Sequence, residues 1–516
     1  MVAKFEKLIF EYSKEGRANF ELPASGVPAS ANSSNYPDSL LRSAKQLPKL
    51  PQVAENELIR HFTNLSRLNY SLDVGFYPLG SCTMKYNPKI NEKIAALDSL
   101  CGVHPLLPDK YCQGMLEIIH NMEKYLCEIL GMKRVTMQPL AGAHGELTGI
   151  MMIKKYHESR GEKRTKVVVP DSSHGTNPAT AAMCGFEIVS IKSDQNGCVD
   201  LEALKSVMDD QVAAFMLTNP NTLGLFDPNI QKIAEIVHKA GALLYYDGAN
   251  LNAIMGIARP GDMGFDVTHV NLHKTFSTPH GGGGPGSGPV GVSERLVKFL
   301  PEPVVEYDSA SQKYYTRSDA TDSIGKVASF YGNFGIIVRA YVYILSLGAK
   351  GLTECSKNAV LNANYLMSHL KKYYELKYDH TCMHEFVLSA DNLSKYGISA
   401  LDVAKRLLDL GYHAPTIYFP LIVHEALMIE PTETECKERL DEFIETMIQI
   451  AKEAETNPEM LKNSPMHTPV ARLDETRAAR TPILRCCSCD GCPSALAKED
   501  KPSKDGASAK RRSQAS

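Results

Sequence analysis

The sequence contains no tryptophan, no apolar run long enough to cross a bilayer and no paired cysteine spacing along its body. The more apolar stretches, such as 212–217, fall well short of the roughly 20 residues that a transmembrane helix needs. The charged start, with Lys4 and Lys7, lacks the apolar core of a signal peptide. We therefore expect the 13 cysteines to be reduced thiols in a cytoplasmic protein. The missing tryptophan excludes no class of function.

A strong charge of either sign is also missing. The formal net charge is −3 over 516 residues, which indicates neither a nucleic-acid surface nor a membrane-binding face. We expect no nucleic acid, no membrane and no metal among the binding partners. Hydrophobic residues make up 43% and charged residues 22% of the chain, as is usual for a soluble globular protein.

Composition divides the chain into four predicted regions. Residues 1–60 are rich in Pro, Ser and Asn, notably from Pro23 to Pro51, and predict an extended arm. Residues 61–334 predict a large α/β domain, and 335–460 a smaller, helix-rich α+β domain. Residues 461–516 predict an irregular tail with a cysteine cluster and a basic end.

Strand and helix patterns alternate through the large domain. Apolar, β-branched runs predict strands at 166–170, 186–191, 213–219, 243–247 and 267–272, with helices between them at 201–209 and 229–240. This alternation is typical of a mostly parallel sheet covered on both faces. In the smaller domain, helices are expected at 335–347, 358–373, 400–409 and 434–455, and short strands at 385–389 and 427–430.

Polar clusters follow several of the predicted strands. They are Asp171–His174, Asn219–Thr222, Asp247–Asn250 and the segment around Lys274. Because ligands bind beyond the carboxyl ends of parallel strands, these clusters predict one site at one edge of the sheet. Asn250 is a binding candidate on this ground.

Lys274 and Asp247 are the most informative pair. An Asp at one strand end, followed by a Lys after the next strand, is the order that pyridoxal phosphate (PLP) chemistry requires. The Lys amine holds the cofactor as a Schiff base, and the Asp carboxylate keeps the pyridine nitrogen protonated, so that the ring accepts electrons. Taken singly, the Asp is typical of a cap and the Lys of a solvated surface.

Two further segments are candidates for the same site. Small residues at Ala141–Ala143 precede a helix expected to begin near Leu147, and their N–H groups would be free to hold a phosphate. His144 would then lie flat on the pyridine ring, although a simple Gly-rich turn with an exposed His explains the pattern as well. His174 is either a second site histidine or a turn residue.

Two Gly- and Cys-rich stretches fit no standard motif. The run Gly281–Gly288 contains G-x-G-x-x-G matches, but Pro285 and Pro289 interrupt it and a strand follows, so we reject dinucleotide binding in favour of a turned loop. The cluster Cys486–Cys492 has a single C-x-x-C rather than two separated knuckles, which favours a redox-exposed tail over a metal site.

Longer motifs extend the pattern around Lys274 into a family resemblance. The chain resembles the P-protein of the glycine cleavage system, glycine dehydrogenase (decarboxylating), and within that family subunit 2 of the two-subunit form. The resemblance runs from about Leu8 to Glu435 and rests on these segments: Gly75–Pro88, Ala141–Glu146, Asp171–Pro178, Thr218–Gly224, Asp247–Asn252, Asn271–Gly284, Ser329–Asn333 and Glu430–Glu433. The tail after residue 460 lies outside it.

The resemblance implies the aminotransferase-like fold (fold type I) of PLP enzymes, with a mostly parallel sheet in the large domain and a smaller α+β C-terminal domain. It makes Lys274 the Schiff-base lysine, Asp247 the pyridinium partner, His144 the stacking histidine and His174 a substrate-side histidine. Gly142, Ala143 and Thr222 are carried over as neighbours of the phosphate or the ring. Tyr77 and Thr83 fall in a substrate-side motif without an assigned role.

The resemblance also implies a reaction and its partners. The reaction is PLP-dependent decarboxylation of glycine, with release of CO2 and transfer of the aminomethyl group to the lipoyl group of the H-protein. The partners are glycine, lipoylated H-protein and subunit 1, in a two-plus-two heterotetramer. His174 and Lys274, once released, are the candidate general acid and base.

Two other functions stay open at this level. One is a different PLP enzyme, such as an aminotransferase or an amino-acid decarboxylase that acts on a free substrate. The other is a non-catalytic partner subunit, against which the presence of Lys274 and Asp247 argues.

Overall fold

The computed structural model describes residues 6–17, 23–24, 26, 37–43, 50–281 and 286–482. The chain divides into two compact units, and the boundary along the sequence falls between Pro469 and Val470. Of the second unit, helix α14 (Glu475–Arg480) is described. Most of the predicted arm from Pro23 to Pro51, the core of the glycine run and the cluster Cys486–Cys492 lie outside the described residues.

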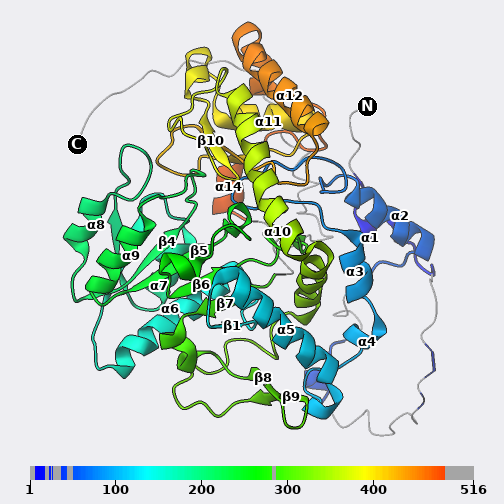
Figure 1. The fold of residues 1–516 in the computed structure, drawn as a ribbon. Helices are drawn as coiled ribbons and strands as arrows, with labels where there is room; N and C mark the ends of the chain where they lie inside the picture. The colour runs from blue at the N-terminus through cyan, green and yellow to red at the C-terminus, as the bar shows by residue number, and fades with distance from the viewer. Residues whose placement is uncertain are drawn as a thin grey trace. The chain divides into compact units, whose positions relative to one another are not determined.

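A seven-stranded sheet forms the centre of the first unit, in the order β1-β7-β6-β5-β4-β2-β3 (Figure 1). Strands β2 to β6 pair in parallel, whereas β7 runs antiparallel to both β6 and β1. The strands are β1 (Arg134–Thr136), β2 (Lys166–Pro170), β3 (Glu187–Ile191), β4 (Val212–Thr218), β5 (Leu243–Gly248), β6 (Val267–Val270) and β7 (Val290–Val292). The mostly parallel sheet predicted from the sequence is confirmed.

Side chains on successive strand residues enter two different cores. On β5, Leu244 and Tyr246 pack with helices α5, α9 and α10, while Leu243 and Tyr245 pack with helix α6. Both faces of the sheet are therefore covered, which explains why these strands are apolar throughout and do not alternate with polar residues. The helices that cover the two faces of the sheet are α5 (Gln113–Leu130), α6 (Gly142–Ser159), α7 (Thr176–Met183), α8 (Leu201–Val207), α9 (Ile230–Lys239) and α10 (Phe334–Leu370).

A smaller antiparallel sheet has the order β10-β12-β11. Its strands are β10 (Phe386–Ser389), β11 (Thr416–Ile417) and β12 (Ala426–Ile429). A separate core packs against it, built from the second half of α10 and from α11 (Ala400–Asp409), α12 (Lys437–Thr456) and α13 (Pro458–Asn463). Phe76, far earlier in the chain, enters this core as well. Packing continues past the predicted start of the tail, since Leu461 and Ser464 are buried.

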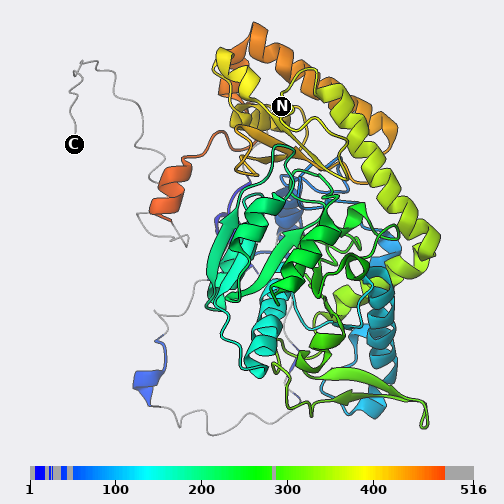
Figure 2. The ribbon, with the colours of Figure 1, turned by 60° about the vertical axis from the view of Figure 1, so that its left-hand side comes forward.

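Helix α10 connects the two cores (Figures 1 and 2). Its first residues, such as Ile337, pack in the core of the large sheet, and its last residues, such as Leu366, in the core of the small one. Within the described residues it is the one helix long and apolar enough to cross a membrane, with a mean hydropathy of 1.3. Non-helical backbone at Gly348 divides it, and its apolar side chains serve the two cores.

The remaining elements lie around these two sheets. A hairpin of β8 (Val304–Asp308) and β9 (Lys313–Arg317) packs against α5. It lies at the opposite end of the unit from α12 (Figure 2). Early in the chain come α1 (Ile9–Tyr12), α2 (Glu55–Ser66), α3 (Lys89–Ala95) and α4 (Asp98–Cys101), of which α3 packs on α10.

Candidate active site

A cavity of about 330 Å³ opens at the carboxyl ends of β4, β5 and β6. Three of its lining residues, Thr218, Asp247 and His269, are register partners on these adjacent strands. The cavity brings together seven of the eight predicted site residues: Gly142, Ala143, His174, Thr222, Asp247, Asn250 and Lys274. The predicted convergence of the strand-end clusters is therefore what the structure has.

Lys274 lies on the segment that connects β6 to β7. Its Nζ donates a hydrogen bond to the carbonyl oxygen of Ser81, at 2.8 Å. Ser81 belongs to the Gly75–Pro88 segment, so this motif, which had no assigned role in the sequence, contacts the lysine directly. The amine has no carboxylate at hydrogen-bonding distance among the described residues and faces the cavity.

Asp247 occupies the end of β5 and is 2% exposed. Burial on its own raises the pKa of this carboxyl, but the nearby His269 and hydrogen bonds from Asn177 Nδ2 and the Ala249 N–H outweigh it and lower the pKa. The side chain is therefore a buried carboxylate at neutral pH, as a partner for a protonated ring nitrogen must be.

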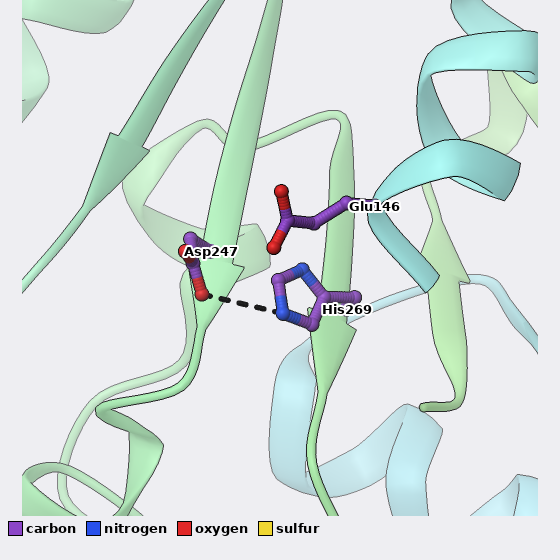
Figure 3. Close-up of side chains that lie close together, drawn as sticks. All are labelled: Glu146, Asp247 and His269. Atoms are coloured by element: carbon purple, nitrogen blue, oxygen red, sulfur yellow. Dashed lines mark ion pairs between the residues drawn. The ribbon is translucent and has the colours of Figure 1, made fainter. Parts of the chain in front are cut away.

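His269 on β6 was not predicted from the sequence. Its Nε2 lies 3.2 Å from Asp247 Oδ1 (Figure 3). Its Nδ1 lies 2.9 Å from the hydroxyl of Tyr245. Burial lowers the pKa of the imidazole, and the negative charge of Asp247 opposes this. The Tyr245 hydroxyl and Nδ1 share a hydrogen bond, which orients the ring, and Nε2 lies in close contact with the carboxylate of Asp247.

Glu146 on α6 is the second unpredicted member of this cluster (Figure 3). Asn177 Nδ2 bridges the two carboxyl groups, at 3.0 Å from Glu146 Oε2 and 3.0 Å from Asp247 Oδ2. Burial, followed by repulsion from Asp247, raises the pKa of Glu146 to about 7. Of the two neighbouring carboxyl groups, Asp247 therefore keeps its negative charge through neutral pH, whereas Glu146 titrates near pH 7.

The start of α6 forms one wall of the cavity. Ala141 caps this helix without a side-chain hydrogen bond, and the first intrahelical bond comes from the N–H of Gly145, so the N–H groups of residues 142–144 have no helical acceptor. A Cβ at Gly142 would fall 2.3 Å from Asn271 Oδ1, so only glycine lets the helix start approach the Lys274 segment. Free N–H groups at a helix N-terminus suit a phosphate.

His144 is the one predicted site residue that does not line the cavity. The helix begins at Gly142 instead of near Leu147, which places His144 within its first turn. There its Nδ1 accepts a hydrogen bond from the Leu140 N–H, at 3.2 Å. The ring-stacking prediction for His144 therefore has no support from this geometry.

His174 does reach the cavity, from the turn before α7. Its Nδ1 contacts the hydroxyl of Thr176 at 2.8 Å, and that hydroxyl lies 2.7 Å from Glu146 Oε1. His174 is an exposed side chain, but the protein atoms around it still lower its pKa, and this effect outweighs the opposing charge of Asp247. The ring is therefore a neutral acid–base group at neutral pH.

Thr222 and Asn250 build the wall between the two sheets. The Thr222 hydroxyl donates to the carbonyl of Ser172 at 2.6 Å, and Asn250 Nδ2 donates to the carbonyl of Pro220 at 3.0 Å. Both side chains are almost fully buried. Within the described residues, the polar atoms of these two side chains are used in hydrogen bonds that stabilise the cavity wall, and few are left free for a ligand.

The cavity also presents buried polar atoms that have no hydrogen-bond partner in the described protein. They include Thr218 Oγ1, Asn271 Oδ1 and His273 Nδ1. Unpaired buried polar atoms are costly unless a ligand satisfies them. A reactive lysine, a buried carboxylate and a glycine-walled helix N-terminus supply the imine link, the pyridinium partner and the phosphate site that PLP needs.

The fold and the cavity define a PLP-dependent enzyme of the aminotransferase-like fold type I. Family models match most of the chain: "Glycine cleavage system P-protein" over residues 30–321 and "Glycine dehydrogenase, C-terminal domain" over residues 355–468. The chain belongs to the glycine cleavage system P-protein family.

Curated relatives cover nearly the whole chain. It is 59% identical over 486 residues to a protein of Caldanaerobacter subterraneus subsp. tengcongensis, across 94% of this chain and 99% of the relative. It is 58% identical over 484 residues to one of Shouchella clausii, across 94% and 98%. Both relatives carry the name "Probable glycine dehydrogenase (decarboxylating) subunit 2".

Solved structures confirm the fold at low sequence identity. An inhibitor-bound glycine decarboxylase (P-protein) superimposes with a TM-score of 0.67 at 19% identity, covering 81% of this chain and 93% of that one. A glutamate decarboxylase of Lactobacillus brevis superimposes with a TM-score of 0.61 at 15% identity, covering 83% and 97%. At these identities the likeness concerns the fold alone.

Proposed function

We propose that this chain is the PLP-binding subunit of a glycine-decarboxylating enzyme, which releases CO2 from glycine and passes the aminomethyl group to the lipoyl group of an H-protein. The observation that carries the proposal is the cavity that joins Lys274, Asp247 and the start of α6. The names of the curated relatives support glycine as the substrate and a second subunit as a partner.

When bound, PLP supplies an electron sink for the electron pair left on Cα after loss of CO2. Lys274 would anchor the cofactor, and the N–H groups of residues 142–144 would hold its phosphate. Asp247 would hold the proton on the ring nitrogen. His269, Asn177 and Ala249 keep that carboxylate ionised and correctly oriented, so the charge is arranged before the substrate arrives.

His174 is the proposed proton carrier at Cα. It lines the cavity, and its Nδ1 is held by the N–H and hydroxyl of Thr176, which leaves Nε2 as the nitrogen available for proton transfer. Lys274, which also lines the cavity, would be the second candidate to carry this proton when its amine is free.

The proposed assembly is two copies of this chain with two of subunit 1, acting on lipoylated H-protein in the cytoplasm. The nine described cysteines are all free thiols, which supports a reducing compartment. Exposed apolar residues in the first hundred residues, such as Ile59, Phe62 and Val74, support a partner on this side.

The test is release of labelled CO2 from carboxyl-labelled glycine by the purified chain, with and without subunit 1 and H-protein, beside Lys274→Ala. We expect release in the complete system and none from the variant, which also loses the visible band of the lysine-bound cofactor. Full release by Lys274→Ala would refute the site assignment. A band without any glycine turnover in the complete system would refute the choice of substrate.

A further inference from the structure

Three buried polar residues of the small domain pack behind the Ser81–Thr83 segment. They are His384 and Glu385, at the start of β10, and Glu430, directly after β12, and each is 0% exposed. His384 Nε2 lies 3.9 Å from a carboxyl oxygen of Glu385 and 3.9 Å from one of Glu430. A fully buried pair of carboxyl groups is costly, so its presence calls for a role.

Both carboxyl groups hold the backbone of the Ser81–Thr83 segment. Glu385 Oε2 accepts from the N–H of Ser81 at 2.7 Å, and Glu430 Oε2 accepts from the N–H of Thr83 at 2.9 Å. Between them His280 Nε2 donates to the carbonyl of Cys82 at 2.8 Å. Three consecutive residues are thus fixed through their main chain, by side chains from both domains.

The backbone of this segment needs such support. Ser81 has a φ of 62° and Thr83 a φ of 46°, and residues other than glycine seldom adopt this left-handed region. The carbonyl of Ser81 accepts the hydrogen bond from Lys274 Nζ at 2.8 Å. The carboxyl groups of the small domain therefore fix the position of the Ser81 carbonyl oxygen, which accepts the hydrogen bond from Lys274.

The hydrogen bonds assign different states to the two carboxyl groups. Both oxygens of Glu385 accept, from Ser81 and from Asn250 Nδ2 at 3.2 Å, as in a carboxylate. Glu430 Oε1 has no partner among the described residues, so it can carry a proton toward His384. Burial raises the pKa of both groups, that of Glu430 to about 7 and that of Glu385 further still, so the pair shares one proton. The hydrogen bonds decide which group carries it: both oxygens of Glu385 are occupied as acceptors, which leaves Glu430 Oε1 for the proton.

We propose that Glu385, as a carboxylate next to protonated Glu430, is a positioning residue that holds the Ser81 carbonyl as the resting place of the Lys274 amine whenever that amine is not bonded to the cofactor. The inference rests on the proposed function only in taking PLP as the partner of Lys274. When the cofactor-free protein captures PLP, the amine nitrogen of Lys274 bonds to the aldehyde carbon of PLP, and the aldehyde oxygen leaves as water. A Lys274 amine that is held at the Ser81 carbonyl starts each capture of PLP from one fixed position.

The test is the rate at which the cofactor-free protein captures PLP, followed by the rise of the visible band after mixing. Borohydride reduction and mass spectrometry then identify Lys274 as the bonded residue. The variants are Glu385→Gln and Glu430→Gln, with Glu445→Gln on the exposed face of α12 as the matched control. Capture does not depend on glycine turnover, so a failure of the proposed substrate would leave this result readable.

We expect Glu385→Gln to slow capture by about tenfold or more, because the amide turns one donor toward the Ser81 N–H or Asn250 Nδ2. Glu430→Gln mimics a protonated carboxyl and should slow capture by at most about threefold. In the complete glycine assay, Glu385→Gln should lower kcat with little change in KM. The control should capture PLP at the rate of the unmodified chain.

Two results would overturn the proposal: capture by Glu385→Gln at the unmodified rate, or a larger effect at Glu430 than at Glu385. If Glu385→Gln does not fold, Glu385→Asp decides the question. It keeps the charge but is one methylene shorter and cannot reach both Ser81 and Asn250, so slowed capture at an unchanged melting temperature is expected. Capture at the unmodified rate would again overturn the proposal.

Discussion

Lys85→Met should destabilise the protein strongly although Lys85 lies outside the cavity. The Lys85 side chain is 0% exposed, and its Nζ donates to Glu433 Oε1 at 2.7 Å, to Asn252 Oδ1 at 2.8 Å and to the Tyr343 hydroxyl at 3.1 Å. These partners come from the Asp247–Asn252 segment, from α10 and from the Glu430–Glu433 segment. One ammonium group therefore joins segments distant in sequence.

The expected cost follows from what the methionine leaves behind. Glu433 would lose its single positive partner among the described residues and keep neutral ones, such as the Asn252 amide at 3.2 Å and the Tyr343 hydroxyl at 3.4 Å. Removing one member of a buried ion pair costs about 3–5 kcal/mol, because the other charge stays buried without compensation. Glu433→Gln should cost less, and the double variant should lose about 2 kcal/mol less than the sum of the single losses.

The assay is equilibrium unfolding in urea, followed by far-UV circular dichroism because the chain has no tryptophan. Lys89→Met is the matched control, since Lys89 pairs with Asp73 at the same 2.7 Å but with both side chains more than half exposed. We expect the control to lose no more than about 1 kcal/mol. A loss at Lys85 no larger than at Lys89, or additive single losses, would refute the reasoning.

Acidification gives a second check on the same pair. Burial raises the pKa of Glu433, but Lys85 outweighs this and leaves the pKa below its usual 4.5. A lowered pKa means that the contribution is present above pH 4.5 and is lost as the pH falls through the lowered value. The difference between the unmodified chain and Lys85→Met should therefore shrink in acid, and a constant difference from pH 7 downward would contradict the ion pair.

Two further predictions concern the cavity. Asp247→Asn should still capture PLP through Lys274, but should release labelled CO2 about 100-fold more slowly or worse, because the ring nitrogen loses its anionic partner; an unchanged rate in protein that shows the visible band would contradict the role of Asp247. Glu146→Gln should flatten the dependence of stability on pH. The pKa of Glu146 is raised to about 7 by burial, so its contribution is full below pH 4.5 and is lost as the pH rises through 7. Urea midpoints measured from pH 5 to 8 would show this, and an unchanged slope in the variant would count against it.

The parallel sheet could be predicted because its strands are buried on both faces. Lys166–Pro170 is β2 to the residue, and the strands around Asp247 and before Lys274 follow the same apolar pattern. Polar clusters after such strands predict the site, since all the parallel strands end at one edge. The direction of β7 had no such signal, because its three apolar residues read the same in either direction.

The residues that the sequence did not reveal lie inside regular elements. His269 sits within the apolar run of β6, and Glu146 within α6, where periodicity explains them as strand and helix residues. Glu385 and Glu430 adjoin short strands of a different sheet. The roles of Glu385 and Glu430 depend on partners more than a hundred residues away, and no local pattern encodes that proximity.

The antiparallel strand β7 has a mechanical consequence for the lysine. It pairs directly with β6. Just beyond this pairing, backbone hydrogen bonds join Val270 to Pro289 and Leu272 to Ser287, so both ends of the segment that carries Lys274 are held by neighbouring strands. A shift of β7 by one residue would move the C-terminal end of this segment by about 3.3 Å and turn the side chains of β7 to the opposite face of the sheet. The register of this three-residue strand thus helps to determine the position of Lys274. A redesign that changes the length of this loop should keep the hydrogen bonds at both of its ends.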